Sequence, residues 1–548
     1  MIVNRRSLLA SLTALGIGST VFHRAAVALV QDQPPPPNGI TPEMIKQAEW
    51  VAGITLTDPE REAVARALAA NRRGIDAARK IELSNDVDLA VRFDPMPRSK
   101  APLQTTVALT PSKHELKKPN SPEAIAFLSI AELGHLLRTK QISSVELTQL
   151  YLERLKKYDT QLKCVITLTE ELALKQAHRA DAELQSGKDR GPLHGIPWGA
   201  KDLIAVKGYK TTWGAQEYKD QTIDMTATVA ERLEQAGAVL VAKLSLGALA
   251  YNDVWFGGRT NNPWNVKEGS SGSSAGSACA VVAGLVGFTL GSETLGSIVS
   301  PSTRCGATGL RPTFGRVSRY GCMTLCWTMD KIGPLCRSVE DCALVLGAIQ
   351  GSDQRDPTAV DRDYQFPSTK SVKELKVGYA NRSEDRPELK VLKELGMQLV
   401  PISLPQRQAG MIVNTILNAE AGTAFDSLVH KGKLDQIGNL WPTPFRAAQW
   451  ITAVDYLRAQ RLRTQLMQQM EKVFEQVDLY VGGNDLGITN LTGHPTVCMP
   501  NGFTKRNDVD VPISLTMTGR LFGEGELLTA AQKYQEATGH HLKRPPLS

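Results

Sequence analysis

A segment rich in glycine and serine lies at the centre of the chain, between Gly269 and Ser300. Seven glycines and eight serines among its 32 residues would suit a flexible linker, but the segment also contains the apolar run 278–290, which a solvated linker would not carry. Small residues flanked by glycines predict a helix packed in the core, with a tight loop at either end. Backbone amides that face inward from such loops can bind a phosphate or stabilise an oxyanion.

No motif supports the phosphate interpretation. The chain contains neither G-x-x-x-x-G-K-[ST] nor a G-x-G-x-x-G that follows a strand. Because hydroxyl groups fill the loops, acyl transfer to a serine is the better interpretation. Ser274 is one candidate nucleophile, in the formal G-x-S-x-G of Gly272–Gly276. However, the polar, proline-containing residues before it do not predict the buried strand that a nucleophile elbow must follow.

Four ordered motifs predict a different and more specific site. They are residues 195–202, which include Lys201; 271–277, which include Ser273; 291–297, which end at Ser297; and 305–313. Together with residues 257–264, 330–334 and 490–495, these motifs resemble the amidase signature family. The resemblance extends from about Ser129 to the C-terminus.

This resemblance implies a Ser–Ser–Lys triad. Ser297 matches the nucleophile, Ser273 matches the bridging serine, typically in a cis peptide, and Lys201 matches the base. The oxyanion hole would be formed by the backbone amides of residues 294–297, which include Thr294, Leu295 and Gly296. Ser274 and Glu293 would support the site, and no metal or cofactor is implied.

Elementary chemistry is consistent with these roles. Serine is a weak nucleophile until a base removes its proton. Lysine can be that base only where burial lowers its pKa, and Lys201 follows the apolar residues 196–200. Each oxyanion-hole donor stabilises the transition state by ~3 kcal/mol in comparable sites. His194, seven residues before Lys201, offers an alternative Ser–His arrangement, although a structural hydrogen bond fits it better.

Three positions depart from the pattern of many family members. Glu293 stands where many have Asp, and it keeps the charge. Leu295 stands where many have Gly, so a side chain on the oxyanion turn is expected to narrow the pocket. Val299 stands where many have Arg, which removes an expected partner of the acid at 293.

Downstream of Ser129, predicted helices and strands alternate. Residues 144–155 have the apolar spacing of a helix, and residues 164–168, 239–242 and 375–380 are strand-like. We expect an α/β fold with a large mixed, mostly parallel twisted sheet, covered by helices on both faces. The expected organisation is an export signal (1–28), a Pro-rich linker (29–40), a helical extension (41–120) in which Thr57–Glu60 begins a helix, and the catalytic domain (121–548).

The first 28 residues resemble a twin-arginine export signal. Arg5 and Arg6 precede the uncharged run 8–22, which is shorter than the ~20 residues that span a bilayer. Residues 26–28 supply a small-residue cleavage pattern. We expect export to the periplasm or another extracytoplasmic space, without a stable membrane span in the mature chain.

Charge and cysteine usage restrict the partners. The chain has 63 Lys and Arg against 56 Asp and Glu, a net charge of +7. Without Arg5, Arg6 and Arg24 of the expected signal the net charge is +4, which predicts no nucleic-acid partner.

The eight cysteines form no C-x-x-C pair and are expected to be buried thiols. His540 and His541 lack metal-ligand spacing.

The expected function is hydrolysis of a carboxylic amide bond through an acyl-serine intermediate. The expected partner is a small-molecule amide, and a homodimer remains open. Two alternatives stay open: a glutaminase-type amidotransferase subunit, and a catalytically weak binding protein on the same fold. The aromatic residues that flank the motifs are candidates for a substrate pocket or for core packing: Tyr251, Trp255, Phe256 and Trp327.

Overall fold

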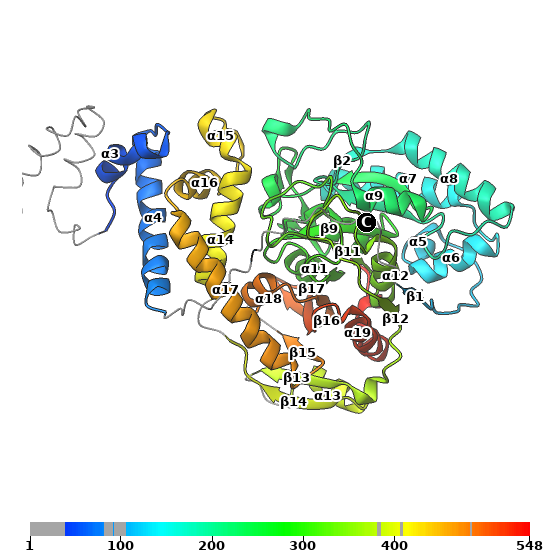
Figure 1. Ribbon diagram of the computed structural model, residues 1–548. Helices are drawn as coiled ribbons and strands as arrows, with labels where there is room; N and C mark the ends of the chain where they lie inside the picture. Colours follow the sequence, from blue (N-terminus) through cyan, green and yellow to red (C-terminus); the bar gives the residue numbers. More distant parts are fainter. Residues whose placement is uncertain are drawn as a thin grey trace, which may run out of the picture.

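A single large sheet organises the chain in the computed structural model, which describes residues 39–81, 91, 106–380, 385–405, 409–482 and 485–547 (Figure 1). Within these residues the sheet has eleven strands. Their order is β14 (Gln398–Ile402), β13 (Lys376–Ala380), β15 (Leu479–Gly482), β17 (Val509–Gly519), β16 (Thr496–Arg506), β10 (Thr308–Arg311), β11 (Lys331–Cys336), β9 (Phe288–Glu293), β3 (Pro197–Lys201), β4 (Val239–Leu244) and β2 (Val165–Leu168).

The sheet is mixed, as predicted. Strand β3 pairs in parallel with β4 and β9, and β13 pairs in parallel with β14 and β15. The strands from β15 through β17, β16, β10 and β11 to β9 pair antiparallel, as β2 does with β4. Parallel pairing is therefore confined to two groups on either side of an antiparallel centre.

Helices cover both faces of the sheet, which confirms the predicted architecture. In β4, Leu240 packs into one hydrophobic core, whereas Val239 and Val241 pack into another on the opposite face, because successive side chains of a strand point to opposite sides. The first core is closed by α6 (Ile130–Arg138), α9 (Thr228–Gln235), α12 (Val339–Ile349) and α19 (Glu524–Thr538). The second is closed by α8 (Glu170–Gln185), α10 (Ala275–Val282) and α11 (Val299–Cys305), and α7 (Ser144–Leu162) contributes to both.

The apolar run 278–290 is only partly helical, which corrects one expectation. Helix α10 ends at Val282, and Gly284 follows with a φ of +64°. Strand β9 begins at Phe288 and pairs with both β3 and β11. Glycine lets the chain reverse there, and the two neighbouring strands supply the hydrogen bonds that a strand needs.

A helical lobe lies beside the sheet domain. It consists of α3 (Pro42–Ala52), α4 (Asp58–Arg79), α14 (Ala409–Ala424), α15 (Asp426–His430), α16 (Pro442–Ala448) and α17 (Ala453–Phe474) (Figure 1). Thr57 and Glu60 form a capping box at the start of α4, where the sequence predicted a helix. Arg446 forms an ion pair with Glu60, and Arg458 Nε donates to the Ala78 carbonyl at 3.0 Å. The N-terminal helices are thus fixed to α16 and α17.

The remaining elements are short. They are α5 (Pro122–Ala126), α13 (Pro387–Glu394), α18 (Leu486–Thr492), β5 (Val254–Trp255), β6 (Gly258–Arg259), β7 (Asn261–Asn262) and β8 (Asn265–Gly269). Strand β1 (Val107–Leu109), within the predicted extension, pairs in parallel with β12 (Tyr364–Phe366) of the sheet domain. The predicted export signal (residues 1–28) and residues 29–38 of the predicted linker lie outside the described residues. Among the described helices, none is both long and apolar enough to cross a membrane.

Candidate active site

Two strands and two helices bring the motif residues together. Lys201 is the last residue of β3, and the parallel register of β3 with β9 places it near Ser292, close to the end of β9. Ser273 and Ser274 directly precede α10, and Ser297 lies just before α11. Residues that are almost a hundred positions apart in the chain therefore meet at the C-terminal ends of the neighbouring strands β3 and β9.

Lys201 is buried in a cage of serine oxygens. Its Nζ lies 2.8 Å from Ser273 Oγ, 3.0 Å from Ser274 Oγ and 2.8 Å from Ser292 Oγ. The side chain is 0% exposed. Burial lowers the pKa of Lys201 to about 7, and the charges of Asp330 and Glu293 only partly oppose that fall.

The hydrogen bonds of Ser274 indicate where the lone pair of neutral Lys201 points. Ser274 Oγ donates its one hydrogen to the Ser292 carbonyl at 3.1 Å, so toward Lys201 it can only accept. The two N–H groups of a neutral Lys201 can then go to Ser274 and Ser292. The lone pair of a neutral Lys201 can then accept from the hydroxyl of Ser273, 2.8 Å away. The same geometry removes Ser274 as a candidate nucleophile, because its hydroxyl is buried and fully engaged.

The two loops that carry Ser273 and Ser297 are joined through the backbone. The Gly272–Ser273 peptide bond is cis. The Ser274 amide donates to the Ser297 carbonyl at 3.1 Å, and the Ser297 side chain is buried beside it. Gly272 is required by close packing, since a Cβ at this position would lie 1.9 Å from the Asn252 carbonyl oxygen.

The turn of residues 294–297, which we call the oxyanion turn, has unused amide donors. The backbone N–H groups of Leu295, Gly296 and Ser297 have no hydrogen-bond acceptor among the described residues. Gly296 has a φ of +82°, a conformation that disfavours any side chain. The Leu295 side chain is 38% exposed on this otherwise buried turn. The turn can therefore present donors to an oxygen atom, with an apolar side chain next to them.

Glu293 has a buried arginine partner, which corrects the expectation based on Val299. Arg311, from β10, places Nη1 2.7 Å from Glu293 Oε1, and both side chains are 0% exposed. Glu293 Oε2 accepts from the amides of Ile298 and Val299 at 2.8 and 2.9 Å. Burial acts to raise the pKa of Glu293, but Arg311 and the backbone donors outweigh it and hold the pKa at about 2. A residue from the next motif thus supplies the missing charge.

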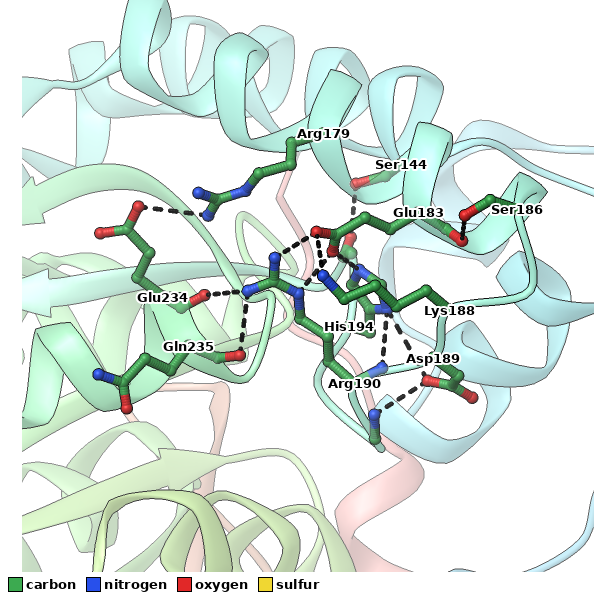
Figure 2. Close-up of polar contacts among 12 residues, drawn as sticks. Ser144, Arg179, Glu183, Ser186, Lys188, Asp189, Arg190, His194, Glu234 and Gln235 are labelled. Carbon is green, nitrogen blue, oxygen red and sulfur yellow. Dashed lines mark hydrogen bonds and ion pairs between the residues drawn. The ribbon is translucent and has the colours of Figure 1, made fainter.

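His194 belongs to a separate polar cluster (Figure 2). Its Nε2 lies 3.2 Å from Glu183 Oε2, and its Nδ1 accepts from the Arg190 amide at 3.1 Å. Glu183 also forms an ion pair with Arg190, and Asp189 lies nearby. Burial lowers the pKa of His194. Its contacts tie the loop before β3 to α8 and include none of the site serines, so the Ser–His arrangement has no support.

Two of the four predicted aromatic residues, Tyr251 and Trp327, lie on loops that contact the site. The Tyr251 ring packs edge-on against Trp441 of the helical lobe at 5.3 Å, on the loop whose Asn252 contacts Gly272. Trp327, 45% exposed, lies on the loop 325–330 that contacts the oxyanion turn. Trp255 and Phe256 pack against each other at 4.9 Å.

Sequence reasoning missed four residues that hold the site together. Ser292 contacts Lys201; Arg311 and Asn490 bind Glu293, with Asn490 Nδ2 2.8 Å from Oε1; and Asp330 binds Thr294. All four lie within or beside the motif segments, but spacing along the chain did not assign them roles. Within the described residues, no group of three or more His, Cys, Asp or Glu side chains is arranged to hold a metal ion.

Comparison with known proteins gives one consistent result. A family model described as Amidase matches residues 146–482. The A subunit of the glutamyl-tRNA(Gln) amidotransferase of Marinomonas sp. (strain MWYL1) is 34% identical over 484 residues, covering 77% of this chain and 99% of that relative. Native peptide amidase from Stenotrophomonas maltophilia is 28% identical with a TM-score of 0.67, covering 76% of this chain and 98% of that one. A bacterial aryl acylamidase of the amidase signature family, 22% identical over 76% of this chain and 97% of its own, shares the fold with a TM-score of 0.67.

Proposed function

The chain belongs to the amidase signature family, and we propose that it hydrolyses a carboxylic amide bond through an acyl intermediate on Ser297. The oxygen cage around Lys201 is the observation that carries this proposal. It buries an amine, lowers its pKa to about 7 and places its Nζ 2.8 Å from Ser273 Oγ. That arrangement suits a base.

In the proposed mechanism, protons move along the three residues. Ser273 passes its hydroxyl proton to Lys201 and takes the proton of Ser297, whose Oγ attacks the substrate carbonyl carbon. The amides of the oxyanion turn bind the resulting oxyanion. The C–N bond then breaks as Ser273 gives a proton to the leaving nitrogen and takes one back from Lys201, which becomes neutral again. Water hydrolyses the acyl ester by the same relay, and the scheme needs no metal or cofactor.

The lowered pKa determines how much base is present. With a pKa of about 7, close to half of Lys201 is neutral at neutral pH. An ordinary lysine would be neutral in roughly one molecule in 3,000 at that pH. Burial thus raises the population of the reactive form by about three orders of magnitude.

A glutaminase-type amidotransferase subunit is the second candidate, favoured by the 34% identity to such a protein over nearly its whole length. Both candidates cleave an amide at Ser297, and they differ in substrate and in partner dependence. Glutamine hydrolysis only in the presence of a partner complex would support the second. Hydrolysis of other amides by the isolated chain would support the first.

For the substrate, we propose an amide with an apolar or aryl group. Leu295 and Trp327 are exposed on the two segments joined by the Thr294–Asp330 hydrogen bond. Their apolar surface would contact the groups beside the scissile bond. A catalytically weak binding protein on this fold would keep the same apolar surface. Labelling of Ser297 by a fluorophosphonate, which requires an activated serine, would exclude that alternative.

We also propose that residues 1–28 direct export of the chain. Arg5 and Arg6 carry that proposal. Replacing both by lysine should retain the chain in the cytoplasm of the producing bacterium. Equal amounts of the two forms in the extracytoplasmic fraction would contradict it.

The test of the proposed function compares two serine-to-alanine variants at nearby positions. Ser297→Ala should abolish hydrolysis of aryl amides and labelling by a fluorophosphonate. Ser302→Ala is the matched control, because Ser302 is buried on α11 and its hydroxyl has no hydrogen-bond partner among the described residues. Unchanged hydrolysis in Ser297→Ala would refute the assignment.

A further inference from the structure

A buried carboxylate that the proposed mechanism does not use lies beside the oxyanion turn. We propose that Asp330 is a positioning residue that holds this turn in the conformation that presents its amide donors. The inference rests on the proposed function, because it assigns a role in that reaction.

Both oxygens of Asp330 bind segments of the site. Oδ1 accepts from Thr294 Oγ1 at 2.6 Å, and Oδ2 accepts from the amides of Leu325 and Cys326 at 2.8 and 2.9 Å. Asp330 is 8% exposed. It directly precedes β11, whose Lys331 is opposite Glu293 in β9. The Asp330 carboxylate therefore joins the segment before β11 to the segment after β9, at the point where the pairing of these two strands ends.

The loop 325–330 is itself held by the helical lobe. Glu420 of α14 accepts from the Thr328 amide at 2.9 Å and from Thr328 Oγ1 at 2.7 Å. Cys326 Sγ lies 3.1 Å from the same carboxylate, and Tyr456 of α17 donates to it at 2.9 Å. The loop that carries Asp330 is thus held in place by α14 and α17. Because this loop is held, Asp330 can restrict the movement of the oxyanion turn that it binds.

The charge of Asp330 also acts on Lys201. Burial raises the pKa of Asp330, while Thr294 and the two amides oppose that rise and favour the carboxylate. Asp330 is the first of the two charges that raise the pKa of Lys201 against burial. The titratable and charged groups around the pair are Glu293, Arg311, Arg319, Lys331, Glu420, Cys326 and Arg463. An anion at 330 stabilises the ammonium that forms when Lys201 accepts its proton.

The test separates the charge of Asp330 from its hydrogen bond. The rate of Ser297 phosphonylation by a fluorophosphonate is measured between about pH 5 and pH 9 for wild type, Asp330→Asn, Thr294→Val and Thr294→Ser. The rate rises with pH as Lys201 loses its proton. In Asp330→Asn we expect a plateau rate lowered roughly 10- to 100-fold and a rise displaced to lower pH, because a neutral amide no longer stabilises the ammonium.

The threonine pair tests the hydrogen bond alone. Thr294→Val should lose a similar factor in rate while its rise stays at the wild-type pH, since the carboxylate is retained. Thr294→Ser keeps the hydroxyl and should restore the rate. This pair decides the question even if Asp330→Asn fails to fold.

Each adverse result has a distinct meaning. A wild-type rate in Thr294→Val, or a wild-type plateau rate in Asp330→Asn, overturns the role of Asp330 while the proposed function stands. An unlabelled wild-type protein overturns the proposed function and this inference with it.

Discussion

The buried pair of Arg311 and Glu293 gives a prediction whose size follows from the structure. Replacing Arg311 by methionine leaves the Glu293 carboxylate buried at 0% exposure without its counter-charge. Breaking such a pair by removing one partner typically costs about 3–5 kcal/mol. The loss should also reach the active site, because Glu293 binds the amides of Ile298 and Val299, just after Ser297.

The pH dependence of folding stability gives a second value for the contribution of this ion pair. The pKa of Glu293 is about 2 in the folded chain, against 4.5 for an ordinary glutamate. A lowered pKa stabilises the fold by about 3 kcal/mol above pH 4.5, and this contribution is lost as the pH falls toward the folded pKa. Arg311 provides the largest contribution that lowers the pKa of Glu293, so we expect this pKa to rise in the variant and the unpaired carboxylate to be protonated as the pH falls. The stability difference between wild type and Arg311→Met should therefore shrink as the pH is lowered.

The assay is urea unfolding at about pH 7.5 and about pH 5, with two comparison variants. Arg72→Met removes an exposed pair with Asp76 and should change stability by less than about 1 kcal/mol. Arg311→Met combined with Glu293→Gln should be more stable than Arg311→Met alone, because no unpaired charge remains. If Arg311→Met costs no more than Arg72→Met, or if its cost does not shrink at lower pH, the reasoning is refuted.

Three further predictions concern the reaction. Amide hydrolysis by the wild type should rise with pH through about 7 to a plateau, as Lys201 becomes neutral, and a profile that is flat from about pH 5 to 9 would contradict its role as the base. Ser292→Ala removes an acceptor from Lys201 and should lower kcat roughly tenfold with an unchanged fold by circular dichroism; a wild-type kcat would exclude a role for that contact. His194→Gln should lower the unfolding temperature but keep kcat per folded molecule, whereas loss of kcat would revive the Ser–His arrangement.

Much of the fold could be predicted because local patterns agree with it. Residues 239–242 are uniformly apolar because β4 is buried on both faces, and the structure places a strand there. The capping residues Thr57 and Glu60 predicted the start of α4. The run 278–290 misled because its composition suits a buried helix and a buried strand equally well. Pairing with β3 and β11 decided between them.

In the candidate site, too, some residues could be predicted from the sequence and others could not. Lys201, Ser273 and Ser297 could be named because each lies in a motif of specific residue types. The partners Arg311 and Asp330 could not, since an ion pair or hydrogen bond between strands depends on the order of those strands. Position 299 shows this limit: comparison with the family pattern suggested a lost charge, but the antiparallel centre of the sheet brings Arg311 to Glu293.

By itself, the sequence determined the fold class, the family resemblance and the residues expected to react, because these depend on local composition, periodicity and motif order. Only the tertiary structure decided the burial, the hydrogen-bond partners and the pKa shifts of those residues. Burial of Lys201 and the direction of its hydrogen bonds arise from packing among β3, β9 and α10, and the anchoring of the oxyanion turn comes from a loop held by the helical lobe. Electrostatic effects depend on distance and burial in space, and neither can be counted along a chain.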